Sequence, residues 1–274
     1  MIQALACSER IVERLMGPPQ RGLVHSAFSS AANLLFAGDF LLSLNASPSA
    51  VQPASTALER GLLMPNGLLL SAPAGAWPFS QLKAGMSAIL GAGWLVLETL
   101  PCSLECAACP RWNPRIQRPP ILDLGLLLAN ARRLAAMCQP SIELPVGIDG
   151  ADILTLAAHL CGRGPGLTPS GDDFLAGWLA AGWLLYGPLP AFLEIAQHIV
   201  KLARQRTHLL SQCWLSYAAA GDIASPVNRL LATLHSPDQH QLQSTARAVL
   251  ALGATSGHDL VHGILYALNQ YPVF

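Results

Sequence analysis

The sequence predicts an α+β protein in which an N-terminal mainly β part, barrel- or sandwich-like, is followed by a C-terminal α-helical bundle. Up to about residue 100, short apolar segments alternate with turns, as in small barrels and sandwiches. Beyond about residue 120, longer segments of helix-forming residues are separated by helix caps. The region between them is rich in proline. We therefore predict a mainly β domain at 1–105, a Pro-rich linker at 106–120 and a helical domain at 121–274 that carries glycine-rich motifs.

The N-terminal half contains two clear turns. Gly38-Asp39 is a hairpin-type turn between two apolar runs, and Met64-Pro65-Asn66-Gly67 precedes another apolar run. The elements expected here are helices at 8–16 and 82–90, strands at 23–28, 33–36, 40–44, 68–71 and 93–99, and loops at 47–55 and 72–78.

The C-terminal half has helix start and stop signals throughout. Ser225-Pro226 is typical of an N-cap followed by proline in the first helical position, and Gly221 and Gly253 are typical helix ends. The expected helices are 122–138, 150–161, 172–186, 190–220 (one long helix or two collinear ones), 225–234, 238–252 and 256–269.

Composition narrows the class of protein. The 274 residues are 52% hydrophobic and only 12% charged, with no net charge, so there is no basic field for nucleic acid. So few charges favour a large core and contacts with other subunits. The longest apolar run, Phe174–Leu185, is shorter than the roughly 18 residues that span a bilayer. The N-terminus has no convincing signal peptide and the seven cysteines are scattered, so we expect a cytoplasmic protein without membrane partners.

The stretch 162–177 is the strongest candidate site. Its first ten residues contain four glycines and two prolines, and an apolar helix is expected to follow. Thr168-Pro169 is typical of an N-cap and first helical residue. Gly164 and Gly166 permit backbone angles that other residues resist. Free N–H groups at this helix start could bind an anion, which Arg163 could grip bidentately. The alternative is a well-capped buried helix after a tight loop.

The carboxylates of Asp172 and Asp173 suit the first turn of that helix because of its dipole. They could also repel an anion, or hold a cation that bridges to one. We expect no dedicated metal site and no cofactor other than Mg²⁺ in that role.

The stretch 253–259 repeats this pattern, with Thr255, Ser256 and Gly257 before Asp259 in the first turn of a helix. Two such helix starts, facing one pocket, would bind a phosphate or a carboxylate well. The alternative is two ordinary capped helices.

Cysteine and histidine patterns leave several possibilities open. Cys102, Cys106 and Cys109 have the spacing of the cluster-binding motif of radical enzymes, so an iron–sulfur cluster, a zinc site with Cys138 or a histidine, and an unliganded loop are all considered. His258 and His262 are four residues apart on one helix, but Asp259 between them complicates a zinc interpretation.

Three motifs resemble those of a bacterial family long described as a domain of unknown function. The stretch 162–177 resembles its signature. Ser216–Gly221 with Ala224–Pro226 is similar to its middle motif, and Leu252–Gly257 with Asp259 and Gly263 to its last. One branch of this family includes the small subunit of the allantoin-pathway oxamate carbamoyltransferase. The resemblance implies a complex with larger protein subunits that interconverts oxalurate plus phosphate with oxamate plus carbamoyl phosphate.

The leading hypothesis is a subunit of an oxamate carbamoyltransferase-like enzyme that binds a small anionic substrate. Ser170, Asp172 and Asp173 are the candidate catalytic residues. The candidate substrate-binding residues are Arg163, Gly164, Gly166, Thr168, Thr255, Ser256, Gly257 and Asp259. The alternatives are a non-catalytic metabolite-binding scaffold subunit and a metal-dependent hydrolase that uses Asp172 and Asp173.

Overall fold

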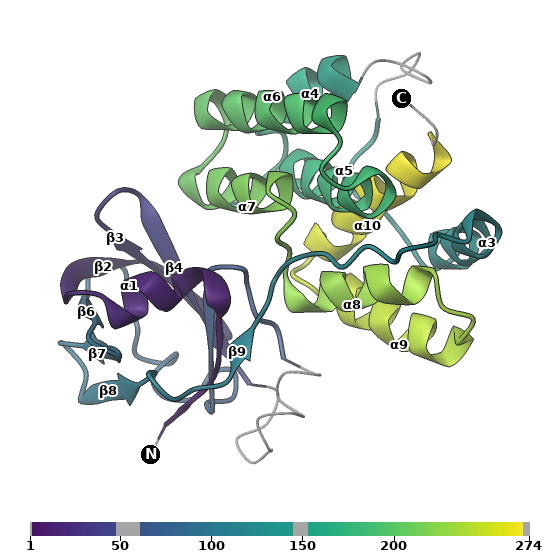
Figure 1. The fold of residues 1–274 in the computed structure, drawn as a ribbon. Coiled ribbons are helices and arrows are strands. Elements are labelled where there is room, and N and C mark those ends of the chain that lie inside the picture. The colour runs from purple at the N-terminus through teal and green to yellow at the C-terminus, as the bar shows by residue number, and fades with distance from the viewer. Residues whose placement is uncertain (1, 48–60, 145–152, 271–274) are drawn as a thin grey trace. The chain divides into compact units, whose positions relative to one another are not determined.

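The computed structural model describes residues 2–47, 61–144 and 153–270, and the chain divides into two compact units (Figure 1). The first comprises Met1–Pro114 with Ala224–Pro226, and the second Arg115–Ile223 with Val227–Phe274. The first unit contains a curled mixed sheet and the second is helical, which confirms the α+β prediction. The loop predicted at 47–55, beyond Ser47, and the start of the helix predicted at 150–161 lie outside the described residues.

The described strands form a nine-stranded sheet in the order β8-β7-β6-β2-β3-β4-β5-β1-β9. The pairs β4/β5 and β1/β9 are parallel, and the other neighbours are antiparallel. The strands are β1 (Ala4–Ser8), β2 (Gln20–Ala27), β3 (Ala31–Phe36), β4 (Phe40–Ala46), β5 (Gly67–Leu70), β6 (Ser87–Gly91), β7 (Trp94–Leu97), β8 (Cys102–Glu105) and β9 (Arg111–Trp112). A 3-10 turn, η1 (Glu9–Ile11), and α1 (Val12–Met16) follow β1 where a helix was predicted.

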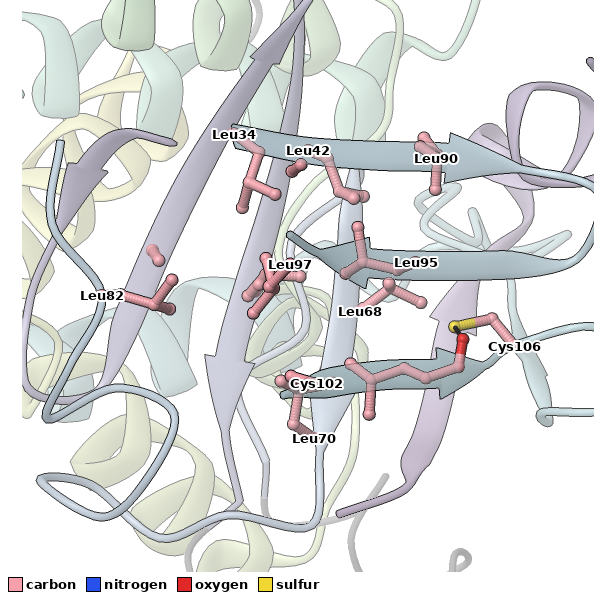
Figure 2. Close-up of a cluster of buried hydrophobic side chains, with 14 of the residues drawn as sticks. Leu34, Leu42, Leu68, Leu70, Leu82, Leu90, Leu95, Leu97, Cys102 and Cys106 are labelled. Carbon is pink, nitrogen blue, oxygen red and sulfur yellow. Dashed lines mark hydrogen bonds between the residues drawn. The ribbon is translucent and has the colours of Figure 1, made fainter. Parts of the chain in front are cut away.

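The core of this sheet is built from leucines on alternate strand positions. Leu34 and Leu42 are cross-strand neighbours on β3 and β4, and Leu95 lies on β7. Figure 2 shows the three side chains in one cluster, and all three are fully buried. Strand side chains alternate between the two faces, so one face of the curled sheet collects them. Each buried leucine contributes roughly 2 kcal/mol of hydrophobic stabilisation.

The predicted helix at 82–90 is wrong, because this segment contains a turn followed by strand β6. Met86 N donates to Lys83 O at 3.2 Å, and Gly85 between them has a φ of 86°. From Ser87 on, burial alternates, with Ala88 and Leu90 in the core. That two-residue period is the strand signal that the helix formers in the segment obscured.

The region predicted as a linker at 106–120 contributes to the sheet. Strand β9 pairs in parallel with β1, and Cys7 N donates to Pro110 O at 2.9 Å. Further along, Ile116 N donates to Gly221 O at 2.8 Å within the helical unit.

The helical unit is arranged around one apolar helix, α5, whose described neighbours include α4, α6, α7 and α10 (Figure 1). The helices are α3 (Leu124–Ala135), α4 (Ile153–Leu160), α5 (Ser170–Tyr186), α6 (Pro190–Arg206), α7 (Leu209–Ala219), α8 (Ser225–Leu234), α9 (Gln239–Leu250) and α10 (Ser256–Asn269). No helix in the described ranges has both the length and the apolar character that a bilayer crossing requires.

The segment 190–220 is neither one long helix nor two collinear helices. Thr207 and His208 are extended, with ψ of 176° and 153°, so the chain turns and α7 packs against α6 (Figure 1). No glycine or proline stands at this break, so the sequence carries no stop signal there.

Helices α5 and α10 touch backbone to backbone through two glycines. A Cβ added to Gly177 would lie 1.9 Å from the carbonyl oxygen of Leu260. One added to Gly263 would lie 1.9 Å from the carbonyl oxygen of Phe174. This contact fixes the two helices against each other, and it thereby positions their N-terminal ends.

Candidate functional site

The loop before α5 is shaped by glycines with left-handed backbones. Gly162 and Gly164 have φ of 76° and 121°. A Cβ would lie 2.1 Å from Arg206 O at Gly162 and 2.7 Å from Ser170 N at Gly164, so no larger residue fits either position. The predicted cap is off by one residue, because Pro169 is extended (ψ 143°) and serves as the N-cap, and Ser170 is the first helical residue.

The first-turn N–H groups of α5 are mostly occupied, contrary to the expectation of free donors. Gly171 N donates to Arg163 O at 2.9 Å. The N–H groups of Asp172 and Asp173 both donate to Pro169 O, at 2.9 and 3.1 Å. Within the described part of the chain, only the Ser170 N–H of this turn has no acceptor, so a ligand here would depend more on side chains than on backbone donors.

Asp172 holds two neighbouring segments together. Its Oδ1 accepts a hydrogen bond from Gly162 N at 2.8 Å, and its Oδ2 accepts one from the Thr207 hydroxyl. The side chain is 2% exposed. These contacts give Asp172 a structural role at the ends of α4 and α6.

The start of α10 lies beside the start of α5. The hydroxyl oxygens of Thr168 and Ser256 are 3.4 Å apart. Gly257 packs against the end of α9, where a Cβ would lie 2.0 Å from Val249 O. The two glycine-rich stretches therefore meet, and Gly257 serves that packing.

A third segment, residues 138–144, crosses both helix starts and was not predicted. The carboxylate of Asp259 accepts hydrogen bonds from Ser141 N (2.8 Å), Ile142 N (3.1 Å) and the Ser141 hydroxyl (2.7 Å). The Ser141 hydroxyl also lies 3.1 Å from that of Ser170. No motif marks this segment, because its position depends on contacts with residues more than a hundred positions away.

These three segments line an open pocket of about 450 Å³. Arg163 supplies a guanidinium group, and Ser141, Ser170 and Thr255 supply hydroxyl groups. The other residues that line it are Ile142, Glu143, Gly164 and Pro165. Ser170 is buried at the base of α5, whereas Arg163 and Thr255 are exposed, and Arg163 Nη1 contacts His159 Nε2. A cation, several hydroxyls and one carboxylate suit a small molecule with both anionic and amide groups.

Asp173 is a buried acid one turn from Ser170 on the same helix face. Burial raises its pKa from 3.8 to about 8, and the carboxylates of Asp259 and Asp172 raise it too, although a hydrogen bond with Ser256 opposes them. Its Oδ2 has no hydrogen-bond partner among the described residues. Asp173 is therefore mostly protonated at neutral pH and can donate a proton.

His262 lies on α10 one turn from Asp259. Burial lowers its pKa, and the nearby Asp259 partly opposes this. Its ring packs edge-on against Phe174, with 5.3 Å between ring centroids. Its ring therefore lies at the contact between α10 and α5, where burial favours the neutral form.

The predicted site residues fall into groups. Those that line the pocket are Arg163, Gly164, Ser170 and Thr255. Thr168 and Ser256 join the two helix starts, and Gly166 forms an exposed left-handed turn with φ of 90°. Asp172, Asp173 and Asp259 are buried, and Gly257 packs against α9.

The cysteine and histidine candidates do not form a ligand set. In the described ranges, no three His, Cys, Asp or Glu side chains are arranged to hold a metal ion. Cys102, Cys106 and Cys109 are instead buried in the first unit. His258 Nδ1 accepts a hydrogen bond from Gln139 N at 2.9 Å, so it helps to hold the 138–144 segment.

Replacing Asp259 by asparagine should release the 138–144 segment. The three hydrogen bonds that the Asp259 carboxylate accepts would be weakened or lost, because the NH₂ group of an amide would face hydrogen-bond donors. We therefore expect the free energy of unfolding to fall by about 2 kcal/mol. Hydrogen exchange at residues 138–144 should accelerate at least roughly tenfold.

Asp238→Asn is the matched control, because Asp238 caps the exposed start of α9. It should cost at most about 1 kcal/mol and leave exchange at 138–144 unchanged. Equal exchange in both variants would contradict the role given to Asp259.

Fold and site together define the class: an α+β chain with a polar pocket at two glycine-rich helix starts. The family model described as "Oxamate carbamoyltransferase subunit AllH" matches residues 160–268. This range contains all three motifs and, apart from Ser141, Ile142 and Glu143, every residue that lines the pocket. Over this segment the chain is similar to that family. No solved structure matches the chain.

Proposed function

We propose that this chain is a subunit of an oxamate carbamoyltransferase-like enzyme and that the pocket at the starts of α5 and α10 binds its anionic substrate. The observation that carries the proposal is the meeting of Arg163, Ser170 and Thr255 around one pocket, within the segment that matches the family model. The reaction that this function implies is oxalurate plus phosphate to oxamate plus carbamoyl phosphate.

The pocket's groups complement the two halves of such a substrate. The Arg163 guanidinium and the hydroxyls of Ser170 and Thr255 can donate to a carboxylate or phosphate. Glu143 would repel an anion placed next to it, but its carboxylate can accept hydrogen bonds from the NH₂ of a carbamoyl or oxamate group. The substrate would therefore bind with its anionic end toward Arg163 and its amide end toward Glu143.

The chemistry requires one proton to move. A phosphate oxygen attacks the ureido carbonyl carbon of oxalurate, and the bond to the oxamate nitrogen breaks. That nitrogen takes up a proton from an acid of the site, and the proton that hydrogen phosphate loses restores the acid. Asp173, with its pKa raised to about 8 by burial, is protonated at neutral pH and suits this role. Ser256, at the start of α10, hydrogen-bonds to Asp173 and contacts Thr168, so the acid lies close to the place where the two helix starts meet.

Larger subunits complete the enzyme in this proposal. Among the described residues that line the pocket, Arg163 alone is a cation, and a phosphate and a carboxylate together call for more positive charge than one guanidinium supplies. Partner chains would contribute the rest. We place the complex in the cytoplasm, where a kinase can use carbamoyl phosphate to make ATP.

Of the two alternatives, the metal-dependent hydrolase is weakened by Asp172, because both of its carboxylate oxygens already accept hydrogen bonds within the protein. A Mg²⁺ ion held by Asp172 and Asp173 would have to displace these hydrogen bonds. The non-catalytic scaffold differs from our proposal in one outcome, namely that the pocket would bind a metabolite without affecting turnover.

The test is the activity of the chain assembled with the subunits encoded by neighbouring genes. Ser170→Ala and Arg163→Gln should each lower kcat/KM for oxalurate at least roughly a hundredfold, since each removes a donor to the charged substrate. Arg204→Gln, on the exposed face of α6, is the matched control and should change it less than about twofold. Full activity in both pocket variants would favour the scaffold.

A further inference from the structure

We propose that the exposed face of helix α3 packs against the same face of a second copy of this chain. Helix α3 lies beside α9 and α10 in the helical unit (Figure 1). Its inner side is buried, and Asn130 fixes it there by donating to Leu234 O at 3.0 Å and to Ser236 O at 2.9 Å. The opposite side of the helix is therefore held outward in one orientation.

The outward side of α3 is apolar although it faces solvent. Ile121, just before the helix, is 87% exposed, and Leu124 and Leu128 are 38% and 39% exposed. The two leucines are four residues apart and so lie one above the other on the helix. Arg132 and Ala135 are exposed on the same side. Large exposed apolar side chains grouped on one helix mark a protein–protein contact.

The charges at the two ends of this face favour a second copy as the partner. Asp123 stands at the start of α3, where its Oδ1 accepts a hydrogen bond from Leu126 N at 3.0 Å. Arg132 lies near the other end. Asp123 is five residues before Leu128, and Arg132 is four residues after it. If two such helices pack antiparallel about a two-fold axis at Leu128, the carboxylate of one copy comes level with the guanidinium of the other. The mismatch of about 1.5 Å along the helix is small for an arginine side chain.

The apolar residues fit the same arrangement. Leu128 meets its own counterpart on the axis, and Leu124 packs against the aliphatic part of Arg132 of the other copy. The antiparallel direction also places the dipoles of the two helices head to tail. The face is thus complementary to itself in both charge and apolar surface. Since α3 leads into the 138–144 segment, the pairing also steadies the start of a segment that lines the pocket.

Sedimentation velocity of the full chain over a range of concentrations tests the pairing. We expect a dimer that Leu128→Glu weakens at least roughly tenfold, because two carboxylates then meet on the axis. Arg132→Glu should weaken it roughly fivefold, because two symmetric exposed ion pairs are lost. Leu189→Glu is the matched control, because Leu189 is 40% exposed but lies at the start of α6. This variant should dimerise like the parent protein.

Leu128→Cys tests the position of the axis. Because residue 128 faces its own counterpart, this variant should form a disulfide between two chains on mild oxidation. Leu189→Cys should cross-link no more than the parent protein does. A chain that stays monomeric at every concentration would overturn the proposal, and so would a Leu128→Glu variant that dimerises as tightly as the parent. Protection of α3 from hydrogen exchange only when larger subunits are added would assign the face to them and would also overturn it.

Discussion

Replacing Gly177 or Gly263 by alanine is expected to destabilise the helical unit by roughly 3 kcal/mol or more. Alanine is normally preferred to glycine inside a helix by about 1 kcal/mol. Here the added Cβ would lie 1.9 Å from a backbone carbonyl oxygen of the partner helix in either case. Backbone cannot rotate away as a side chain can, so α5 and α10 would have to separate, and the overlap outweighs the intrinsic preference.

Denaturant unfolding of each variant measures this effect. Gly125→Ala is the matched control, because a Cβ at this position of α3 meets nothing closer than the Asp123 side chain at 3.4 Å. It should be neutral or stabilising by up to about 1 kcal/mol. If Gly177→Ala and Gly263→Ala were as stable as Gly125→Ala, the packing of α5 on α10 would be wrong, and so would the pocket at their ends.

Asp173→Asn should lower the kcat of the assembled enzyme by about 10²- to 10⁴-fold while leaving the fold intact. The amide matches the protonated carboxyl in shape but supplies no titratable proton. The same substitution should raise the stability of the protein, although it lowers kcat. A raised folded-state pKa, about 8 against 3.8, means that the folded state binds the proton more tightly. The stabilisation that protonated Asp173 contributes to the wild-type protein is complete below about pH 4, and it is lost as the pH rises toward 8.

The variant should therefore gain stability relative to wild type by up to roughly 1 kcal/mol per pH unit between pH 5 and 7. Subtracting the two proteins removes the contributions of the other titrating groups, because these are present in both. Asp172→Asn is the contrasting control, and it should lose stability because its carboxylate accepts two hydrogen bonds. A difference between Asp173→Asn and wild type that does not change with pH would show that Asp173 is ionised in the folded protein.

Much of the fold could be predicted because its signals are local. Helix α10 begins and ends at the predicted residues, since Gly253 and Ser256 mark its start. The turn at Gly38-Asp39 has the positive φ at both residues that such a hairpin requires. The errors arose where local preference and long-range pairing disagree, as at Ser87–Gly91, where helix-forming residues join a sheet through β2.

The site was predictable only in part, for the same reason. Arg163, Ser170 and Thr255 belong to motifs, and motif spacing placed them near helix starts. The burial that makes Asp172 a structural residue and raises the pKa of Asp173 depends on packing, and adjacent aspartates in a sequence give no sign of it. Ser141 and the segment around it reach the pocket only through tertiary contacts with Asp259.

The most direct test of the account is the binding of oxamate to the assembled complex, measured by titration calorimetry with wild type, Arg163→Gln and the control Arg204→Gln. The pocket is proposed to hold the carboxylate through Arg163, so wild type and Arg204→Gln should bind oxamate with the same Kd. Arg163→Gln should bind at least roughly tenfold more weakly, the effect of losing one charge-assisted pair. Equal affinity in all three proteins would contradict the assignment of this pocket as the substrate site.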